Sequence, residues 1–339
     1  MNSDDFPQYD ERLLTPEVKE DEIKHDILLR PTNFSEYVGQ KKIVENINVM
    51  VQSALMRKHA MDHVLLSGPP GLGKTSLAMI IAKELKTELH VISGPAIEKK
   101  GDLAAILTNL NAGDVLFIDE IHRMHISVEE ILYSAMEDYR LDIMIGQGTS
   151  ARTMQIDVAP FTLIGATTRS GLLSNPLRDR FMADLHFDFY ASSELAQIIE
   201  RNALKLKVQL SPEARKKISG CSRGTPRIAN RVLRRVRDFA LVAHKDQVQL
   251  PEVEEALRLM DIDELGLDRM DRKILSVIEE YYAGGPVGIE ALCATLAEDR
   301  TTIEDVYEPY LLKEGFLLRT PRGRMISDKG RTHIKSVET

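Results

Sequence analysis

The segment GPPGLGKT, at residues 68–75, constrains the fold of this chain more than any other stretch of its sequence. It matches the phosphate-binding pattern G-x-x-x-x-G-K-[ST] in full, between an apolar run at 63–68 and a helical pattern at 74–85. Glycines allow left-handed turns, so backbone N–H groups can point at phosphate oxygens beside the positive end of the following helix. A glycine-rich turn that binds nothing is the alternative, and the strand–loop–helix context disfavours it. We therefore predict a nucleotide-binding α/β domain.

The chemistry of this site depends on the end of the loop and on an acidic pair further along. The nucleotide contacts expected from the loop are Gly71, Gly73, Lys74, Thr75 and Ser76. Lys74 would neutralise the β- and γ-phosphates of ATP, and the Thr75 hydroxyl would ligate Mg²⁺. Asp119 ends the apolar run VLFID, where it can also hold Mg²⁺, and Glu120 beside it can polarise the attacking water. A solvated acidic pair is the alternative, but a glutamate here favours hydrolysis over nucleotide binding alone.

Apolar runs and helical patterns alternate along the first half of the chain. The apolar runs cover 63–68, 89–94, 114–119 and 161–167, and the helical patterns between them cover 74–85, 101–111 and 127–139. This alternation predicts a parallel sheet covered by helices on both faces. Residues 141–158 interrupt it with two alternating apolar arms around a Gly/Ser/Thr-rich centre, which predicts a β-hairpin. Apolar residues on both arms, outside the main sheet, indicate a surface that docks a partner.

Three further motifs lie where they can act on a nucleotide. Thr168 in GATTR ends the fourth apolar run and can orient the attacking water, although a plain strand cap is the alternative. NPLRDRF supplies Arg178 and Arg180, either of which can be an arginine finger for a neighbouring subunit or simply a surface arginine. Arg227, in GTPR at a predicted helix start, can reach back to a γ-phosphate from a second domain.

The pattern of elements divides the chain into a tail and three domains. We expect an acidic mobile tail at 1–25, an ATPase domain at 26–190, a helical lid at 191–262 and a winged-helix domain at 263–339. The last follows from helical patterns at 272–282, 288–297 and 303–315 and two short strands within 316–330. Residues 316–339 hold six basic and two acidic residues, although the chain has a net charge of −8. Binding responds to local potential, so the basic end indicates a DNA partner.

Composition argues against several other classes of protein. The chain has no Trp and only 5% aromatic residues, which disfavours base stacking as the main mode of nucleic-acid binding. Cys221 and Cys293 match no disulfide or zinc spacing and are expected to be reduced. No apolar run approaches the roughly 18 residues of a membrane span. The acidic N-terminus has no signal-peptide pattern, so we expect no membrane contact and a cytoplasmic location.

The order GPPGLGKT, FIDE, GATTR, LRDRF and GTPR is similar to that of AAA+ ATPases with a helical lid. Longer stretches, such as MEDYRLDIMIGQGTSARTMQID and EPYLLKEGFLLRTPRGRM, resemble the RuvB family of bacterial Holliday-junction branch-migration motors, over residues 26–335. The resemblance implies an AAA+ P-loop core with a lid and a winged helix. It also implies a hexameric ring around duplex DNA that acts in recombination and DNA repair. Met182 departs from the family pattern, which has glycine after RDRF.

The resemblance assigns further roles. It implies that Thr168 is sensor 1, Arg180 the finger in trans and Arg227 sensor 2. The other residues that would border the nucleotide are Leu29, Arg30, Glu137, Asp138, Tyr139 and Tyr190. The residues that would contact the DNA backbone are Arg300, Arg319 and Arg324. The hairpin 141–158 would dock the junction-binding partner RuvA, and the resolvase RuvC would join the complex.

Two other classes of function remain beside the predicted ATP-driven DNA translocase. An ATP-switched DNA-binding protein would share the AAA+ core and the winged helix without translocating. Glu120, Thr168 and Arg180 together favour turnover over such a switch. A protein-remodelling ATPase would have no evident use for the basic winged helix.

Overall fold

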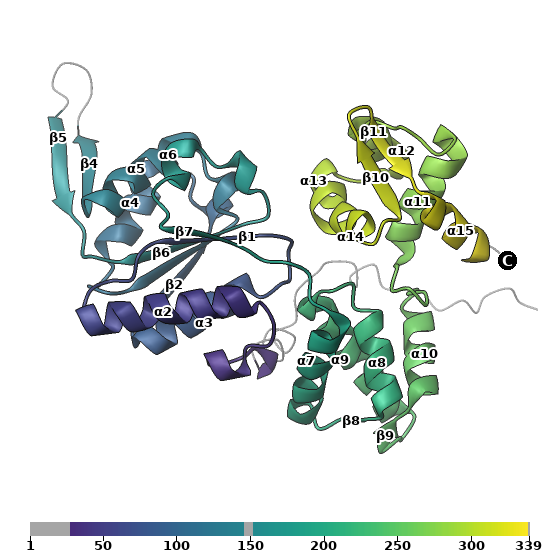
Figure 1. Ribbon diagram of the computed structural model, residues 1–339. Coiled ribbons are helices and arrows are strands. Elements are labelled where there is room, and N and C mark those ends of the chain that lie inside the picture. Colours follow the sequence, from purple (N-terminus) through teal and green to yellow (C-terminus); the bar gives the residue numbers. More distant parts are fainter. Residues whose placement is uncertain (1–27, 146–151, 338–339) are drawn as a thin grey trace, which may run out of the picture. The chain divides into compact units, whose positions relative to one another are not determined.

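Short apolar segments form one parallel sheet in the computed structural model, which describes residues 28–145 and 152–337 (Figure 1). The strands are β1 (Val64–Ser67), β2 (Leu89–Ser93), β3 (Val115–Asp119), β6 (Thr162–Thr167) and β7 (Ala183–His186). They lie in the order β2–β3–β6–β1–β7, and each neighbouring pair is parallel. Parallel neighbours need crossover connections, and these bring helices onto the faces of the sheet. The predicted α/β fold with a parallel sheet is confirmed.

Helices cover both faces of this sheet. One face carries α2 (Lys41–Arg57) and α3 (Lys74–Leu85), and the other carries α4 (Lys100–Thr108), α5 (Ile126–Glu137) and α6 (Asn175–Arg178) (Figure 1). Successive strand residues point to opposite faces, so Val64 and Leu66 join the core under α2 and α3, whereas Leu65 joins the core under α4 and α5. Burial on both faces explains the nearly continuous apolar sequences of the strands.

The edge strand β7 was not predicted. Its sequence ADLH buries Leu185 but leaves Asp184 and His186 exposed, so it lacks the apolar run of the inner strands. The Ser67 hydroxyl donates to Asp184 at 2.9 Å across the pair. One short edge strand with polar residues thus escapes a search based on apolar runs.

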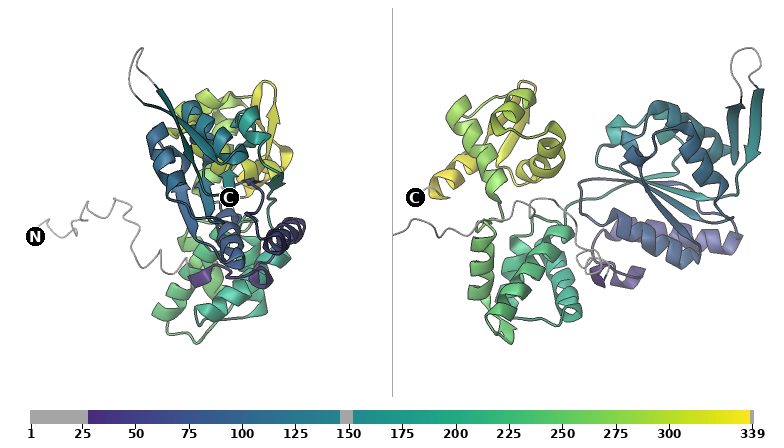
Figure 2. Two further views of the ribbon diagram at one scale, coloured as in Figure 1. Left: turned by 90° about the vertical axis from the view of Figure 1, so that its left-hand side faces the viewer. Right: turned by 180° about the vertical axis from the view of Figure 1, so that it is seen from behind.

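The predicted hairpin is present as the antiparallel pair β4 (Arg140–Ile145) and β5 (Arg152–Asp157), which extends away from the main sheet (Figure 2). Its Gly/Ser/Thr-rich centre at 146–151 lies outside the described residues. Leu141 and Val158 are buried at the base, in the core under α4 and α5, whereas Met154 is 48% exposed. Part of the apolar sequence therefore anchors the hairpin, and part of it faces solvent.

The lid consists of helices that follow the sheet. They are α7 (Ser192–Lys205), α8 (Pro212–Gly220), α9 (Pro226–Val242) and α10 (Leu250–Leu259), and a short parallel pair joins β8 (Gln209–Leu210) to β9 (Gln247–Val248). Pro226 occupies the first turn of α9, where its missing N–H costs nothing. Ala229, Val232, Leu233 and Val236 form the buried stripe of this helix.

The head, residues 264–337, is a winged helix. Its elements are α11 (Arg269–Tyr282), α12 (Ile289–Leu296), α13 (Arg300–Thr302), the π-helical turn η7 (Ile303–Tyr307), α14 (Glu308–Lys313), the wing strands β10 (Leu317–Thr320) and β11 (Gly323–Ile326), and α15 (Asp328–Val337). The helix predicted at 303–315 thus begins as a π-turn and continues as α14. The second predicted strand ends earlier than expected, because Ser327 accepts the Gly330 N–H at 3.0 Å and starts α15.

By its internal contacts the chain forms two units, Met1–Arg30 and Pro31–Thr339. The acidic tail predicted at 1–25 lies outside the described residues. In the part of the chain that the structure describes, no helix has both the length and the apolar sequence needed to cross a bilayer.

Candidate active site

The carboxyl ends of three neighbouring strands bring the predicted catalytic residues to one edge of the sheet. β6 lies between β3 and β1, so the segments that follow these three strands are adjacent. The phosphate loop follows β1, Asp119 ends β3, and Thr168 follows β6 directly. The Gly68 N–H donates to the Thr167 carbonyl at 3.1 Å, which joins the start of the loop to the end of β6. Ligands of open α/β sheets bind at such an edge.

The phosphate loop requires glycine at two of its positions. Gly71 has φ +79°, and a Cβ there would lie 2.8 Å from the Thr225 side chain and 3.0 Å from the Arg227 Cβ. Gly73 has φ +102°, and a Cβ there would lie 2.7 Å from the Tyr37 hydroxyl. The loop therefore packs against the start of α9 on one side and against Tyr37 on the other, at distances that a larger residue would not permit.

Lys74 begins α3 and is held by its own loop. Its ammonium donates to the carbonyl oxygens of Gly68 (2.7 Å) and Pro69 (2.9 Å). An ammonium has three donors, so one is left for a phosphate oxygen. Burial lowers the pKa of Lys74 to about 8, and the negative charges of Asp119 and Glu120 oppose this shift. The loop therefore fits a phosphate group, whose charge would stabilise the ammonium, and Thr75 and Ser76 follow on the first turn of α3.

Glu120 follows β3 in a left-handed conformation, with φ +51°. Burial raises the pKa of Glu120, and the adjacent Asp119 carboxylate adds to that shift. The close approach of the Glu120 backbone to Gly94 holds it in place, since a Cβ on Gly94 would lie 2.5 Å from the Glu120 carbonyl oxygen. Asp119 and Glu120 are thus adjacent carboxyl groups beside the buried Lys74, which is a donor set suited to Mg²⁺ and to a water molecule.

His122 is a site residue that the sequence analysis missed. Its Nδ1 lies 2.9 Å from the Thr167 hydroxyl, and its Nε2 lies 3.5 Å from a Glu120 carboxylate oxygen. Burial lowers the pKa of His122, which favours the neutral ring. The Thr167 hydroxyl accepts the Arg169 N–H at 2.9 Å, so its own proton can go to Nδ1, and Nε2–H then points at Glu120. Proximity to Glu120 in FIDEIH was the only sequence signal.

Two tyrosine hydroxyls donate hydrogen bonds to backbone carbonyls of the phosphate loop. Tyr190 donates to the Leu72 carbonyl at 3.1 Å, and Tyr37 donates to the Gly73 carbonyl at 3.3 Å. Tyr190 was predicted at this site, and Tyr37 was not, because NFSEYVGQ carries no pattern that marks it. Arg227 lies beside the loop as well: its backbone N–H is 3.4 Å from the Gly71 carbonyl oxygen, and the residue is exposed.

The candidate finger Arg180 lies beside other residues predicted to border a nucleotide. Its Nη2 donates to Glu137 at 2.9 Å, and its guanidinium lies 4.8 Å from the centre of the Tyr133 ring. Glu137 ends α5, and Asp138 and Tyr139 connect it to β4. Arg178 instead approaches Asp184 at 3.5 Å. The structure therefore groups Arg180, but not Arg178, with Glu137.

Three family models match successive parts of this chain. They describe the P-loop domain of the Holliday junction DNA helicase RuvB (residues 29–187), the RuvB AAA lid domain (190–263) and the RuvB C-terminal winged-helix domain (264–335). The chain belongs to the RuvB family.

Individual relatives agree with this assignment. RuvB from Kosmotoga olearia is 54% identical over 96% of this chain and 95% of its own length, and RuvB from Myxococcus xanthus is 54% identical over 95% and 94%. Both are described as subunits of the Holliday junction branch migration complex. The structure of Thermotoga maritima RuvB, described as a Holliday junction branch migration motor, has a TM-score of 0.85 at 51% identity and covers 91% of this chain and 98% of its own. The AAA+ P-loop core, lid and winged helix are thus shown.

Met182 is the position at which this chain departs from the family pattern, which has glycine after RDRF. Its side chain is exposed, and its N–H donates to the His63 carbonyl at 2.9 Å. It is not among the described residues with positive φ, so this position does not require glycine.

The three arginines predicted to contact DNA have different surroundings in the head. Arg300 is paired with Glu290 (3.0 Å) and Glu304 (3.1 Å), with half its side chain exposed. Arg319 is the most exposed of the three and lies 3.9 Å from Glu304. Arg324 is only 6% exposed and is bound by Glu308 and by Glu304 at 2.9 Å.

The prediction that Arg324 contacts the DNA backbone stays a prediction, and the structure gives this residue partners inside the head. Arg324 stands opposite Arg319 in the wing, and two like charges on neighbouring strands would repel each other. The side chain of Arg324 instead turns inward to the carboxylates of η7 and α14, where it is an internal ion-pair partner.

Two predicted site residues lie in the first unit. Leu29 is buried and Arg30 is half-buried, and their expected place beside the nucleotide stays a prediction.

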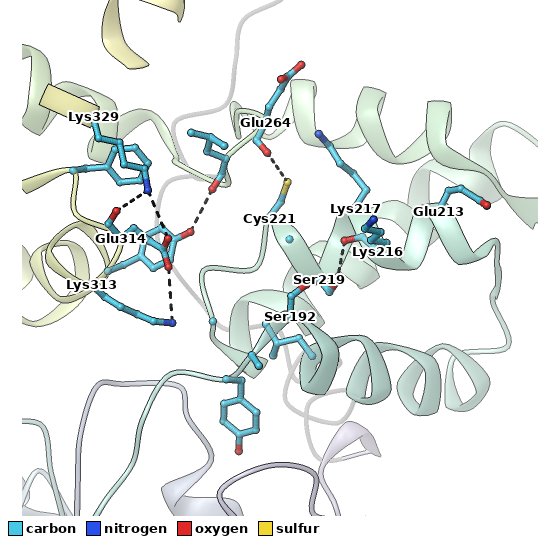
Figure 3. A pocket seen from close by; sticks show the side chains of 18 of the residues that line it. Ser192, Glu213, Lys216, Lys217, Ser219, Cys221, Glu264, Lys313, Glu314 and Lys329 are labelled. Carbon is cyan, nitrogen blue, oxygen red and sulfur yellow. Dashed lines mark hydrogen bonds and ion pairs between the residues drawn. The ribbon is translucent and has the colours of Figure 1, made fainter. Parts of the chain in front are cut away.

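A cavity of about 700 Å³ lies between the lid and the head, and residues 68–75 of the phosphate loop are not among those that line it (Figure 3). Lys313, Glu314 and Lys329 line it from the head. Its buried polar groups have partners within the chain: Ser219 donates to the Lys216 carbonyl at 2.9 Å, and the Cys221 thiol lies 3.6 Å from the Glu264 carbonyl oxygen. The cavity therefore presents no unsatisfied group that calls for a ligand.

Proposed function

We propose that this RuvB-family ATPase drives branch migration of Holliday junctions in recombination and DNA repair, with ATP and Mg²⁺, as a ring of six copies. The observation that carries the proposal is the meeting of Lys74, Glu120 and Thr168 at one sheet edge, in a chain that also carries a winged helix. The RuvB relatives are described as subunits of a branch migration complex, which supports the choice of substrate.

Each site residue has a role in this proposal. Lys74 binds the β- and γ-phosphates, and Glu120, oriented by His122, accepts a proton from the attacking water. Thr75 and Asp119 would hold Mg²⁺, which when bound neutralises charge on the phosphate oxygens. Thr168 orients the water. Arg180 of a neighbouring copy and Arg227 of the same copy stabilise the charge that develops on the γ-phosphate.

We infer that the hairpin β4–β5 docks RuvA. Leu141 and Val158 are buried at its base, so they hold the hairpin in place rather than meet a partner. Met154 is exposed further along β5, which suits an apolar contact with another protein. RuvC would join the same assembly through the junction. ATP and chromosomal DNA, as the proposed substrates, suggest that the complex works in the cytoplasm.

The test is a junction-migration assay with Glu120→Gln. This variant keeps the volume of the side chain but removes its basicity, so ATP should still bind while turnover falls by about 10²–10⁴-fold. Migration of a synthetic four-way junction, assayed with RuvA, should be lost to the same extent. Glu130→Gln is the matched control, because Glu130 is an exposed α5 carboxylate paired with Lys100. Full turnover by Glu120→Gln would overturn the catalytic assignment.

The second candidate is an ATP-switched DNA-binding protein without translocation. The same assay separates the two, since a switch would bind the junction in an ATP-dependent way and leave its arms unmoved. That result with the wild-type chain would favour the switch.

A further inference from the structure

The π-helical turn η7 of the head is held by an arginine from the ATPase domain. Arg169 directly follows Thr168, and its Nε donates to Asp305 at 2.6 Å. Its Nη2 also lies 3.3 Å from Glu304, and the Thr168 hydroxyl lies 3.5 Å from Asp305. All three head-side contacts fall within η7, so the segment that carries the sensor threonine is joined to one turn of the DNA-binding head.

A second arginine holds the same turn from the lid. Arg223 lies four residues before Arg227, and it is only 5% exposed. Its Nη2 donates to the Val306 carbonyl at 3.4 Å, and its guanidinium lies 5.7 Å from the centre of the Tyr307 ring. Its Nη1 binds Asp271, on α11, at 2.9 Å. Buried arginines satisfied by several partners of this kind fix the groups that they join.

Glu304 connects η7 to the basic residues of the head. Its carboxylate lies 3.1 Å from Arg300 Nε, 2.9 Å from Arg324 Nη2 and 3.9 Å from Arg319 Nη2. The Glu304 side chain is only 9% exposed, and two oxygens serve these three arginines and Arg169. Because these arginines share one carboxylate, a change in one contact alters the interactions that Glu304 can make with the others.

We propose that η7 is the coupling element between the ATP site and the DNA-binding wing, with Arg169, Arg223 and Asp305 as positioning residues and Glu304 as the link to the wing arginines. A shift of the Thr168 segment or of the lid moves η7, and Glu304 then redistributes its contacts among Arg300, Arg319 and Arg324. π-helical turns are rare, and they occur frequently at functional sites. This inference rests on the proposed function.

The reciprocal nature of coupling gives the sharpest test. If nucleotide alters DNA affinity through η7, the ratio of the DNA dissociation constants with ADP and with a non-hydrolysable ATP analogue plus Mg²⁺ measures that coupling. We would measure this ratio with the full chain and a random-sequence duplex, at protein concentrations where sedimentation shows equal assembly in both nucleotides. In Asp305→Asn and in Arg169→Gln the ratio should move toward one, by about 2- to 30-fold.

Controls separate coupling from simple damage to the head. Glu279→Gln removes a carboxylate that pairs with Arg331 at 3.0 Å inside the head, so it should keep the wild-type ratio. The effect of the double variant Arg169→Gln/Asp305→Asn should be smaller than the sum of the two single effects, because each variant alone already removes the contact between Arg169 and Asp305. Arg169→Lys keeps the charge and should restore part of the ratio.

The possible results distinguish failure of this inference from failure of the proposed function. A wild-type ratio near one would overturn the inference, and with absent ATP turnover it would overturn the proposed function as well. A wild-type ratio that Asp305→Asn and Arg169→Gln both preserve would overturn the inference alone. In the DNA-stimulated ATPase assay, loss of maximal stimulation at an unchanged half-saturating DNA concentration would support coupling, whereas a shift in that concentration alone would place the effect in DNA binding.

Discussion

The ATP site and the wing are both proposed to bind phosphate groups, yet they hold their cations in opposite ways. Lys74 is held by neutral carbonyl oxygens, and burial lowers its pKa to about 8. Arg324 is held by the carboxylates of Glu308 and Glu304, and these hydrogen bonds raise its pKa further. In the described contacts Lys74 donates to backbone carbonyls rather than to a carboxylate, which leaves a donor for a phosphate of ATP. The wing already has its anions, so the more exposed Arg319 is left to meet DNA.

The largest expected effect concerns Arg180. This arginine is paired with a carboxylate, that of Glu137, as the wing arginines are, although the proposed target of Arg180 is ATP. Arg180→Ala should lower the turnover of ATP by about 10³–10⁵-fold, because a finger stabilises transition-state charge in a neighbouring copy. Steady-state ATPase assays would measure it. If the finger acts in trans as proposed, the two defects lie on opposite sides of a subunit interface, so mixing Arg180→Ala with Lys74→Ala should restore part of the activity.

Arg178→Ala is the matched control, and it should retain turnover. If Arg178→Ala is the inactive variant and Arg180→Ala the active one, the finger is Arg178. The grouping of Arg180 with Glu137 would then be a structural ion pair.

The next effect tests whether Arg324 is structural. Arg324→Ala would leave the carboxylates of Glu308 and Glu304 buried without their partner, which should destabilise the head by about 3–5 kcal/mol. Urea unfolding followed by near-ultraviolet signals of the head tyrosines would measure the free energy of unfolding. Arg319→Ala, across the same strand pair, should change it by less than about 0.5 kcal/mol. Equal, small effects of both changes would contradict the internal role of Arg324.

The difference between the ATP site and the wing also explains which features could be predicted from the sequence. The phosphate loop, the pair Asp119 and Glu120, and the alternation of strands with helices follow from residue types at fixed local spacing, so the α/β core could be predicted, whereas the strand order and the edge strand β7 could not. His122 and Tyr37 could not, because their roles depend on contacts with Thr167 and Gly73 that local spacing does not encode.

The wing was predicted less well, because its contacts also depend on residues that lie far apart in the sequence. Its basic residues indicated an exposed surface, but the partner of Arg324 is Glu308, 16 residues earlier and on another element. No sequence pattern marks the π-turn that opens the predicted third helix. The residues of α15 are mostly polar, and its start depends on the Ser327 cap. A cluster of basic residues in the sequence predicts an exposed basic surface only where no acidic side chain packs against those residues in the folded protein.

A smaller effect follows from the lowered pKa of Lys74. The folded, ligand-free protein loses the Lys74 proton as pH rises through about 8, whereas bound phosphate would hold that proton. ATP affinity should therefore be constant below pH 7 and fall by up to about tenfold per pH unit above 8. Equilibrium binding of a fluorescent ATP analogue from pH 6 to 9 would measure this. Lys74→Met should bind weakly with no such slope, and an equal slope in that variant would assign the titration to another group.

The smallest effect tests Arg319 as a DNA contact. Arg319→Ala should weaken binding about equally for duplexes of different sequence, because a phosphate contact carries no sequence information. The log–log dependence of affinity on salt should become shallower by about one unit for the lost contact. Fluorescence anisotropy at several salt concentrations would show it, with Arg258→Ala as a control, since Arg258 is an exposed arginine of the lid paired with Glu255. A sequence-selective loss would mean that Arg319 reads bases. An unchanged slope would mean that the wing's exposed arginine, like its buried one, is committed to carboxylates of the head.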